Sequence, residues 1–191
     1  TWTTCARQAH LKYDVGLAQR KSAKLVFGQC MHLALAEYFE SCGDYDRAVD
    51  TFRSSWAAPD KIGHRIDYWP KMTSYQSLRT KGLEILERLH AQELFRTWTI
   101  IAVEHPFLVH LGDHELNGVI DLIAVERSGT GKEILKVVDW KSNAKDPSFA
   151  ELALNTQLTI YLFAVTQREL WTGIENNPSF PPIPNGEWLF E

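Results

Sequence analysis

The sequence predicts an α/β (α+β) domain in which a helical N-terminal half precedes a three-stranded antiparallel meander flanked by helices. Apolar residues recur at helical spacing as far as about residue 95. From Trp98 onward, β-branched apolar runs replace that spacing, and Ser128-Gly129-Thr130-Gly131 between two of these runs is a turn signal. The 191 residues suffice for one domain with a sizeable core, and no repeat or clear boundary divides them. We therefore expect a single domain over residues 1–191.

Three long helices account for the N-terminal half. A short helix or turn and a charged loop are expected over residues 1–22, and Ser22 can cap the first long helix. Cys42-Gly43 ends that helix, and Asp44 opens the second. The expected spans are 23–41, 44–57 and 71–95, with a loop at 59–67. Each span carries an apolar side, so we expect each helix to bury one face.

Three β-branched runs predict the strands of the meander, at residues 98–104, 116–125 and 133–141. Pro106 is expected to limit the first strand, since proline cannot donate to a strand ladder. A further helix is expected from Asp146-Pro147-Ser148 to about Trp171. The tail, residues 172–191, is expected to be loop-rich, with a last short strand at 187–191.

Charge and composition narrow the classes of function and location. The net charge of −4 and the pI near 6.0 give no general signal for nucleic acid, so such a partner would need local basic patches. Lys and Arg residues in the first 24 positions could form one, or could be an ordinary solvated helix face. The three cysteines form no CxxC pair, which is typical of a reducing compartment. Without a membrane-length apolar run or a secretory signal, we expect a cytoplasmic protein, bacterial or in a virus-infected host, with no membrane partner.

Two acids and a lysine occur where the second and third strands lose their apolar character. Asp121 ends the run Gly118-Val119-Ile120-Asp121, and Asp139 and Lys141 follow Val137-Val138. Side chains alternate along a strand, so Asp139 and Lys141 share a face, and a matching register brings Asp121 beside Asp139. Neighbouring carboxylates are costly unless a cation holds them. These residues predict a divalent-metal site on the sheet, although hairpin ends are often acidic simply because they face solvent.

Five short motifs follow one another along the chain. They are Gly28-x-x-x-His32, Glu104 on the first strand, Gly118-x-x-Asp121, Asp139-Trp140-Lys141 and Gln157-x-x-x-Tyr161. Their order and spacing resemble the PD-(D/E)XK nuclease superfamily and, within it, the RecB-like exonuclease branch. The resemblance covers about residues 27–161. It implies a restriction-endonuclease-like core, in which helices flank a central mixed sheet that includes the antiparallel meander.

The resemblance also implies roles at the centre of this core. Asp121 and Asp139 would be catalytic metal ligands, the backbone carbonyl of Trp140 a further ligand, and Lys141 the catalytic lysine. His32 matches the histidine that RecB-like members place on the first core helix as another ligand, although a lone histidine on an apolar helix face is more often a core residue. Carboxylate and carbonyl oxygens suit Mg²⁺, and a histidine ligand also admits Mn²⁺.

Further candidates surround that centre. Glu104 matches a catalytic acid that some members carry on the first strand, with plain surface as the alternative. Gln157 and Tyr161 share one helix face and match residues thought to contact the substrate strand, or else form the edge of the core. Ser142 and Lys145 follow the lysine motif and could contact phosphate.

Three other patterns complete the set of candidates. Several relatives hold an iron–sulfur cluster that begins at a Cys-Pro pair, whereas Cys5 precedes an alanine and no cysteine occurs after Cys42, so no iron–sulfur cluster is expected. His110-x-x-x-His114 has zinc-like spacing only on a helix, and the glycine and aspartate between favour a turn there. The residues Tyr68-Trp69, in a loop that contains basic side chains, could stack on bases.

These features predict a Mg²⁺- or Mn²⁺-dependent deoxyribonuclease. By analogy through His32 and Gln157-x-x-x-Tyr161, it would be an exonuclease that attacks DNA ends or single strands in recombination, repair or replication, with a helicase or recombinase as partner. The alternatives are a structure-specific endonuclease and a DNA-binding or scaffolding domain that keeps the fold without cutting. The complete acid–acid–lysine set argues against the scaffold. A small-molecule enzyme would need a phosphate-binding glycine loop or nucleophile elbow, which the sequence lacks.

Overall fold

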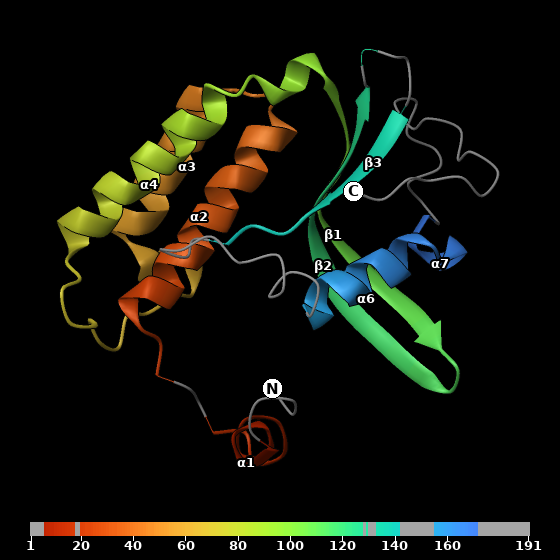
Figure 1. The fold of residues 1–191 in the computed structure, drawn as a ribbon. Coiled ribbons are helices and arrows are strands. Elements are labelled where there is room, and N and C mark those ends of the chain that lie inside the picture. Colours follow the sequence, from red (N-terminus) through yellow and green to blue (C-terminus); the bar gives the residue numbers. More distant parts are fainter. Residues whose placement is uncertain (1–5, 18–19, 128, 130–132, 142–154, 172–191) are drawn as a thin grey trace.

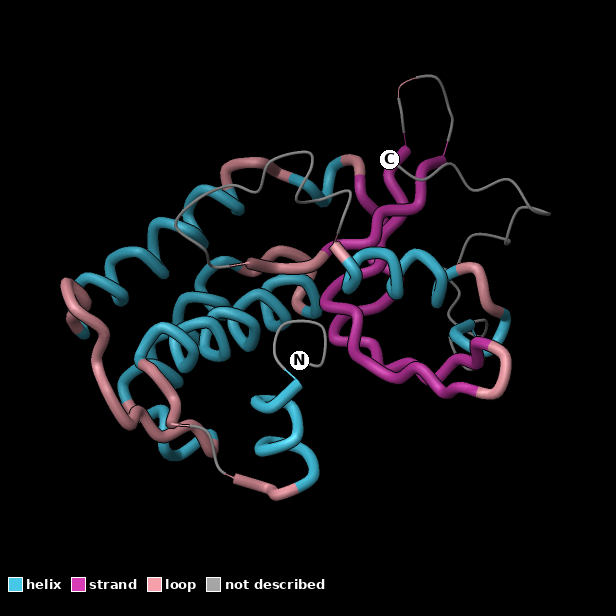
Figure 2. Tube along the Cα trace, turned by 60° about the horizontal axis from the view of Figure 1, so that its bottom comes forward, coloured by secondary structure: helices cyan, strands magenta, loops and turns pink. Residues whose placement is uncertain are grey.

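The computed structural model describes residues 6–17, 20–127, 129, 133–141 and 155–171. Three helices form a layer on one side of a three-stranded sheet, and a shorter helix lies on the other side (Figure 1). The turned view separates the helical layer from the strands in the same way (Figure 2). In chain order the elements are α1 Ala6–Ala9, the π-helical turn η1 His10–Asp14, α2 Ala23–Glu40, α3 Tyr45–Ala57, η2 Pro59–Ile62, α4 Tyr75–His90, η3 Leu94–Arg96, β1 Trp98–Leu111, β2 His114–Arg127, β3 Glu133–Val138, α6 Thr156–Val165 and α7 Arg168–Trp171.

Large side chains hold the helical layer together. Phe27 of α2 contacts the rings of Phe52 and Trp56 of α3 edge-on, with centroids 6.1 and 5.9 Å away. Gly82 of α4 allows the closest approach, because a Cβ there would lie 2.1 Å from the Phe52 ring. Ser22 caps α2 by accepting a backbone N–H from its first turn, so this helix begins where the sequence predicts.

The sheet is antiparallel, with the strand order β1-β2-β3 that the meander predicts. β1 and β2 form a long hairpin, from Trp98 opposite Glu126 to Leu111 opposite His114. β3 pairs only with residues 122–127 of β2. In the described part of the chain, the distal half of the hairpin is therefore two-stranded, and α6 lies against it (Figure 1).

Two hydrophobic cores lie on opposite sides of the sheet. The first joins α2, α3 and α4 to one face and contains Leu122 of β2. The second lies between the other face and α6–α7, and it contains Ile123 and Val125. The neighbours Leu122 and Ile123 thus lie on opposite faces of the sheet, as strand geometry requires. Asp121, directly before this stretch, is also buried.

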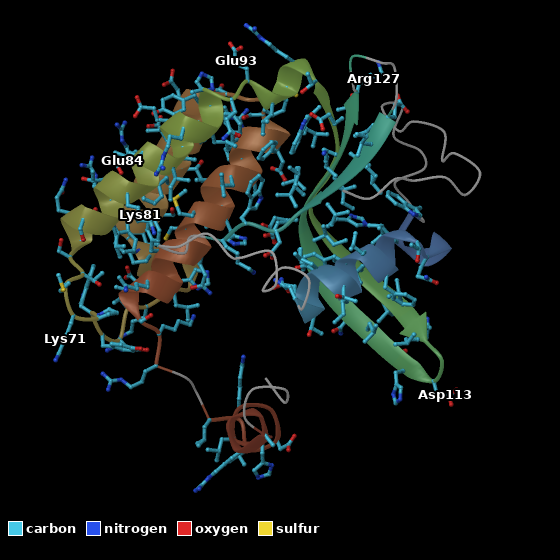
Figure 3. All side chains as sticks on the ribbon, in the orientation of Figure 1. Lys71, Lys81, Glu84, Glu93, Asp113 and Arg127 are labelled. Carbon is cyan, nitrogen blue, oxygen red and sulfur yellow. The ribbon has the colours of Figure 1, made fainter. Side chains whose placement is uncertain are left out.

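Charged side chains occupy the outer surface of both layers. Glu84 on α4 and Asp113 at the tip of the hairpin both lie there (Figure 3). Among the described residues, no helix combines the length and the apolar character needed to cross a membrane.

The strands differ from the prediction in length. β1 continues through Pro106, because it is the outer strand of the described sheet, where a missing N–H is tolerated. β3 ends at Val138, so Asp139, Trp140 and Lys141 follow the strand instead of completing it.

Two helices also differ from the prediction. α4 is shorter than the predicted span 71–95, because Ser74 and Ser77 form a capping box that starts it at Tyr75. In the described part of the predicted helix to Trp171, the helix is interrupted after α6, since the Thr166 hydroxyl donates to the Phe163 carbonyl there and competes with the helical pattern. The predicted start of that helix at 146–148, and the predicted strand at 187–191, lie outside the described residues.

Candidate active site

Asp121 ties the segment after β3 to the middle of β2. The backbone N–H of Trp140 donates to Asp121 Oδ2 at 2.7 Å. The antiparallel register ends with Leu122 opposite Val138, and Asp121 and Asp139 are the next residues beyond that pair on β2 and on the segment after β3. The ring of Trp140 stacks on Phe39 of α2, with centroids 5.3 Å apart, and so packs behind the site.

Side chains from three elements meet at Asp121. His32 comes from α2 and Glu104 from β1, and one ligand atom from each of the three residues lies within 4.8 Å of the other two. His32 Nδ1 lies 3.4 Å from Glu104 Oε1 and 3.7 Å from Asp121 Oδ1. His32 Nε2 lies 3.2 Å from the carbonyl oxygen of Trp140. Glu104 has a φ of 46°, a conformation that interrupts the regular course of β1 at this point.

The electrostatics of this group favour a cation. Burial raises the pKa of Asp121, and the N–H of Trp140 and the nearby His32 offset only part of that rise. Burial likewise raises the pKa of Glu104, and the charge of Asp121 raises it further. A divalent ion would relieve both effects; carboxylate oxygens suit Mg²⁺, and a histidine nitrogen also admits Mn²⁺. His32, Glu104 and Asp121 therefore fit such an ion, and the Trp140 carbonyl lies beside His32.

Lys141 contacts Asp139, although both residues follow the end of β3. Its Nζ donates to the two carboxylate oxygens of Asp139 at 2.9 and 2.8 Å. It also donates to Gln157 Oε1 at 3.0 Å, and Gln157 Nε2 donates to the Tyr161 hydroxyl at 2.7 Å. Asp139 is thus engaged by the lysine, and the group of three around Asp121 does not include it.

Tyr161 anchors these hydrogen bonds to the sheet. Its hydroxyl donates to the carbonyl oxygen of Val119 at 2.6 Å. Val119 lies opposite Pro106 in the β1–β2 hairpin. A Cβ on Gly118 would lie 2.8 Å from the Phe107 ring, which itself packs edge-on against Tyr161. The glycine of the Gly118-x-x-Asp121 motif therefore permits the packing that holds Tyr161.

A comparison of the sequence with models of known protein families agrees with the order and geometry of these residues. The model of the PD-(D/E)XK nuclease superfamily matches residues 1–189. The chain belongs to this superfamily. Its helices and antiparallel sheet are consistent with a restriction-endonuclease-like fold, as predicted. A search of curated proteins found no match. PD-(D/E)XK members are nucleases that use divalent metals and act on DNA, and the family places this chain among them.

The structure brings most of the sequence-predicted residues into one site: His32, Glu104, Asp121, Asp139, Trp140, Lys141, Gln157 and Tyr161. Ser142 and Lys145 lie outside the described residues. His110 and His114 flank the turn of the β1–β2 hairpin, as expected of a surface turn. The carbonyl of Val119 was not predicted, because a backbone acceptor carries no side-chain signal.

Proposed function

We propose that this PD-(D/E)XK member is a Mg²⁺- or Mn²⁺-dependent deoxyribonuclease of the RecB-like type that degrades DNA from its ends. The observation that carries the proposal is the meeting of His32, Glu104 and Asp121 next to the Asp139–Lys141 pair. The histidine on the first long helix supports the RecB-like branch, and with it the exonuclease preference. A helicase or recombinase that exposes DNA ends would be a fitting partner.

Each side chain of the site would have a separate role in phosphodiester hydrolysis. His32, Glu104, Asp121 and the Trp140 carbonyl would hold the ion, which when bound supplies Lewis acidity and an activated water. Lys141 is held between Asp139 and Gln157, so its charge has a fixed position from which to stabilise negative charge developing on the phosphate. Gln157 and Tyr161 orient that lysine, and the hydrogen bond to Val119 fixes their position relative to β2.

The test compares Asp121→Asn and Asp139→Asn with the wild-type protein on labelled linear and circular DNA. We expect Mg²⁺- or Mn²⁺-dependent loss of linear DNA by the wild-type protein, no loss in EDTA, and a decrease of about 10²- to 10³-fold or more in each variant. Asp113→Asn is the matched control, because Asp113 is an exposed aspartate at the hairpin tip, and it should retain full activity.

Other outcomes separate the alternatives. Nicking of circular DNA would show that the protein is a structure-specific endonuclease and not an exonuclease. Binding of DNA without cleavage under every metal condition would show that it is a DNA-binding or scaffolding domain. Undiminished cleavage by either active-site variant would contradict the assignment of these aspartates.

A further inference from the structure

Helix α2 carries a second apolar face besides the one buried in the first core. Residues of this face recur at intervals of three and four positions, and they line a cavity of about 410 Å³: Leu25, Gly28, Gln29, Leu33 and Ala36. We call this cavity the α2 groove. Leu25 and Leu33 are 49% and 42% exposed, although α2 buries its opposite side completely. The groove has the volume of a small-molecule site and is far too small for a duplex.

The α2 groove is continuous with the candidate active site. His32 and Glu104 belong both to the wall of the groove and to the group around Asp121. If the phosphate of a substrate lies at that group, the part of the substrate next to the phosphate would therefore extend into the groove. In DNA, that part is the adjoining nucleoside.

The wall of the groove suits a nucleobase. The side chains of Leu25, Leu33 and Ala36 present apolar surface to the flat face of a ring. Gln29 also lines the groove, and its side-chain amide is of a type that can hydrogen-bond to the edge of a base.

Basic side chains lie beside another part of the groove wall. His64 lines the wall there, and Lys21 Nζ lies 3.4 Å from its Nδ1. Lys24 is exposed in the first turn of α2. The guanidinium of Arg20 lies over the ring of Tyr68, 5.5 Å from its centroid, and this ring is partly exposed. Phosphates leaving the groove would meet these cations, and a further base could stack on the aromatic ring.

We propose that the α2 groove receives unpaired bases of a single DNA strand beside the bond that is cut. The substrate strand would then run from the active site along α2 toward Lys21 and Lys24. A base in a duplex cannot enter, because its edge is paired and its faces are stacked. The inference rests on the proposed nuclease function, and it adds that the enzyme recognises the unpaired state of the substrate through this groove.

The experiment measures binding without cleavage, by fluorescence anisotropy in EDTA at low salt. The probes are a fluorescein-labelled single strand, an abasic strand of the same length and charge, and a blunt duplex. We expect the wild-type protein to bind the single strand about tenfold or more tightly than the abasic strand, because base contacts contribute at least that much in single-strand binding sites. The duplex should bind no better than the abasic strand.

Two variants test whether the preference for the single strand arises in the groove. Gly28→Leu fills it with a side chain, and Leu33→Glu adds a carboxylate to its exposed wall; each should reduce binding of the single strand to the level of the abasic strand. Thr80→Leu is the matched control, since Thr80 is an exposed position on α4 outside the groove, and it should bind as the wild-type protein does. Thermal unfolding of each variant shows whether it is folded.

Equal affinity of the wild-type protein for single and abasic strands, or undiminished binding by both folded groove variants, would overturn the inference. The cleavage assay with Mg²⁺ or Mn²⁺ is separate. Base-dependent binding without cleavage would support the role of the groove and overturn the nuclease proposal. Cleavage without base-dependent binding would support the nuclease proposal and overturn the role of the groove.

Discussion

Asp121 is a buried carboxyl that the ion-free fold holds at a cost. Burial raises the pKa of Asp121 and of Glu104, so each binds its proton more tightly in the folded state than in the unfolded one. Their contribution to folding is therefore favourable at low pH and is lost as the pH rises from the ordinary carboxyl range, about 4, through the raised pKa values. In EDTA at neutral pH, the double variant Glu104→Gln, Asp121→Asn should be more stable than the wild-type protein, and this advantage should shrink as the pH falls.

Urea unfolding at a series of pH values measures that difference in the free energy of unfolding. Asp113→Asn, at the exposed hairpin tip, should show no such pH-dependent gain. A double variant that is less stable than the wild-type protein at neutral pH in EDTA would show that burial and repulsion at this site are unimportant.

At the scale of elements, α6 acts on the site through one tyrosine. The Tyr161 hydroxyl bonds both Gln157 and the carbonyl of Val119, and Gln157 in turn holds Lys141. Tyr161→Phe should therefore lower kcat by about tenfold with little change in KM for DNA, since the lysine loses its orientation but no substrate contact is removed. Steady-state cleavage of labelled DNA measures both constants, and Tyr45→Phe, on α3, is the matched control. A rise in KM with unchanged kcat would instead indicate the direct contact with the substrate strand that the family resemblance implies.

The same element shows what the sequence could and could not predict. The order and type of the long helices and strands of the described chain follow local spacing and β-branched runs, because these signals depend on near neighbours, whereas several of their ends differ. The continuation of β1 through Pro106 could not be predicted, since it depends on β1 lying at the edge of the described sheet. The break after α6 was missed for a similar reason, because the hydroxyl of Thr166 bonds a carbonyl within an otherwise apolar run.

At the scale of the whole molecule, the candidate ion site joins the helical layer to the sheet. Its donors come from α2, β1 and β2, and His32 and Glu104 are 72 positions apart, so only the order of family motifs could predict that they meet. An ion that binds only the folded state adds about 2.7 kcal/mol at a concentration 100-fold above its Kd. We expect Mn²⁺ to raise the Tm of the wild-type protein above its value in EDTA, and His32→Ala to lose most of that increase.

Differential scanning calorimetry with and without Mn²⁺ tests this expectation. His110→Ala, near the hairpin tip, is the matched control and should keep the full increase in Tm. An equal increase in the His32→Ala variant would place the bound ion elsewhere.

Glu104 has a left-handed backbone conformation inside a strand, which glycine would adopt with far less strain. Holding another residue there costs on the order of 1–3 kcal/mol, a considerable part of the marginal stability of a domain. Random substitution would be expected to replace such a residue over time if stability alone were selected. A glycine at this position would relieve that strain but would remove the carboxylate beside Asp121, so the preference of the backbone and the ion site oppose each other here.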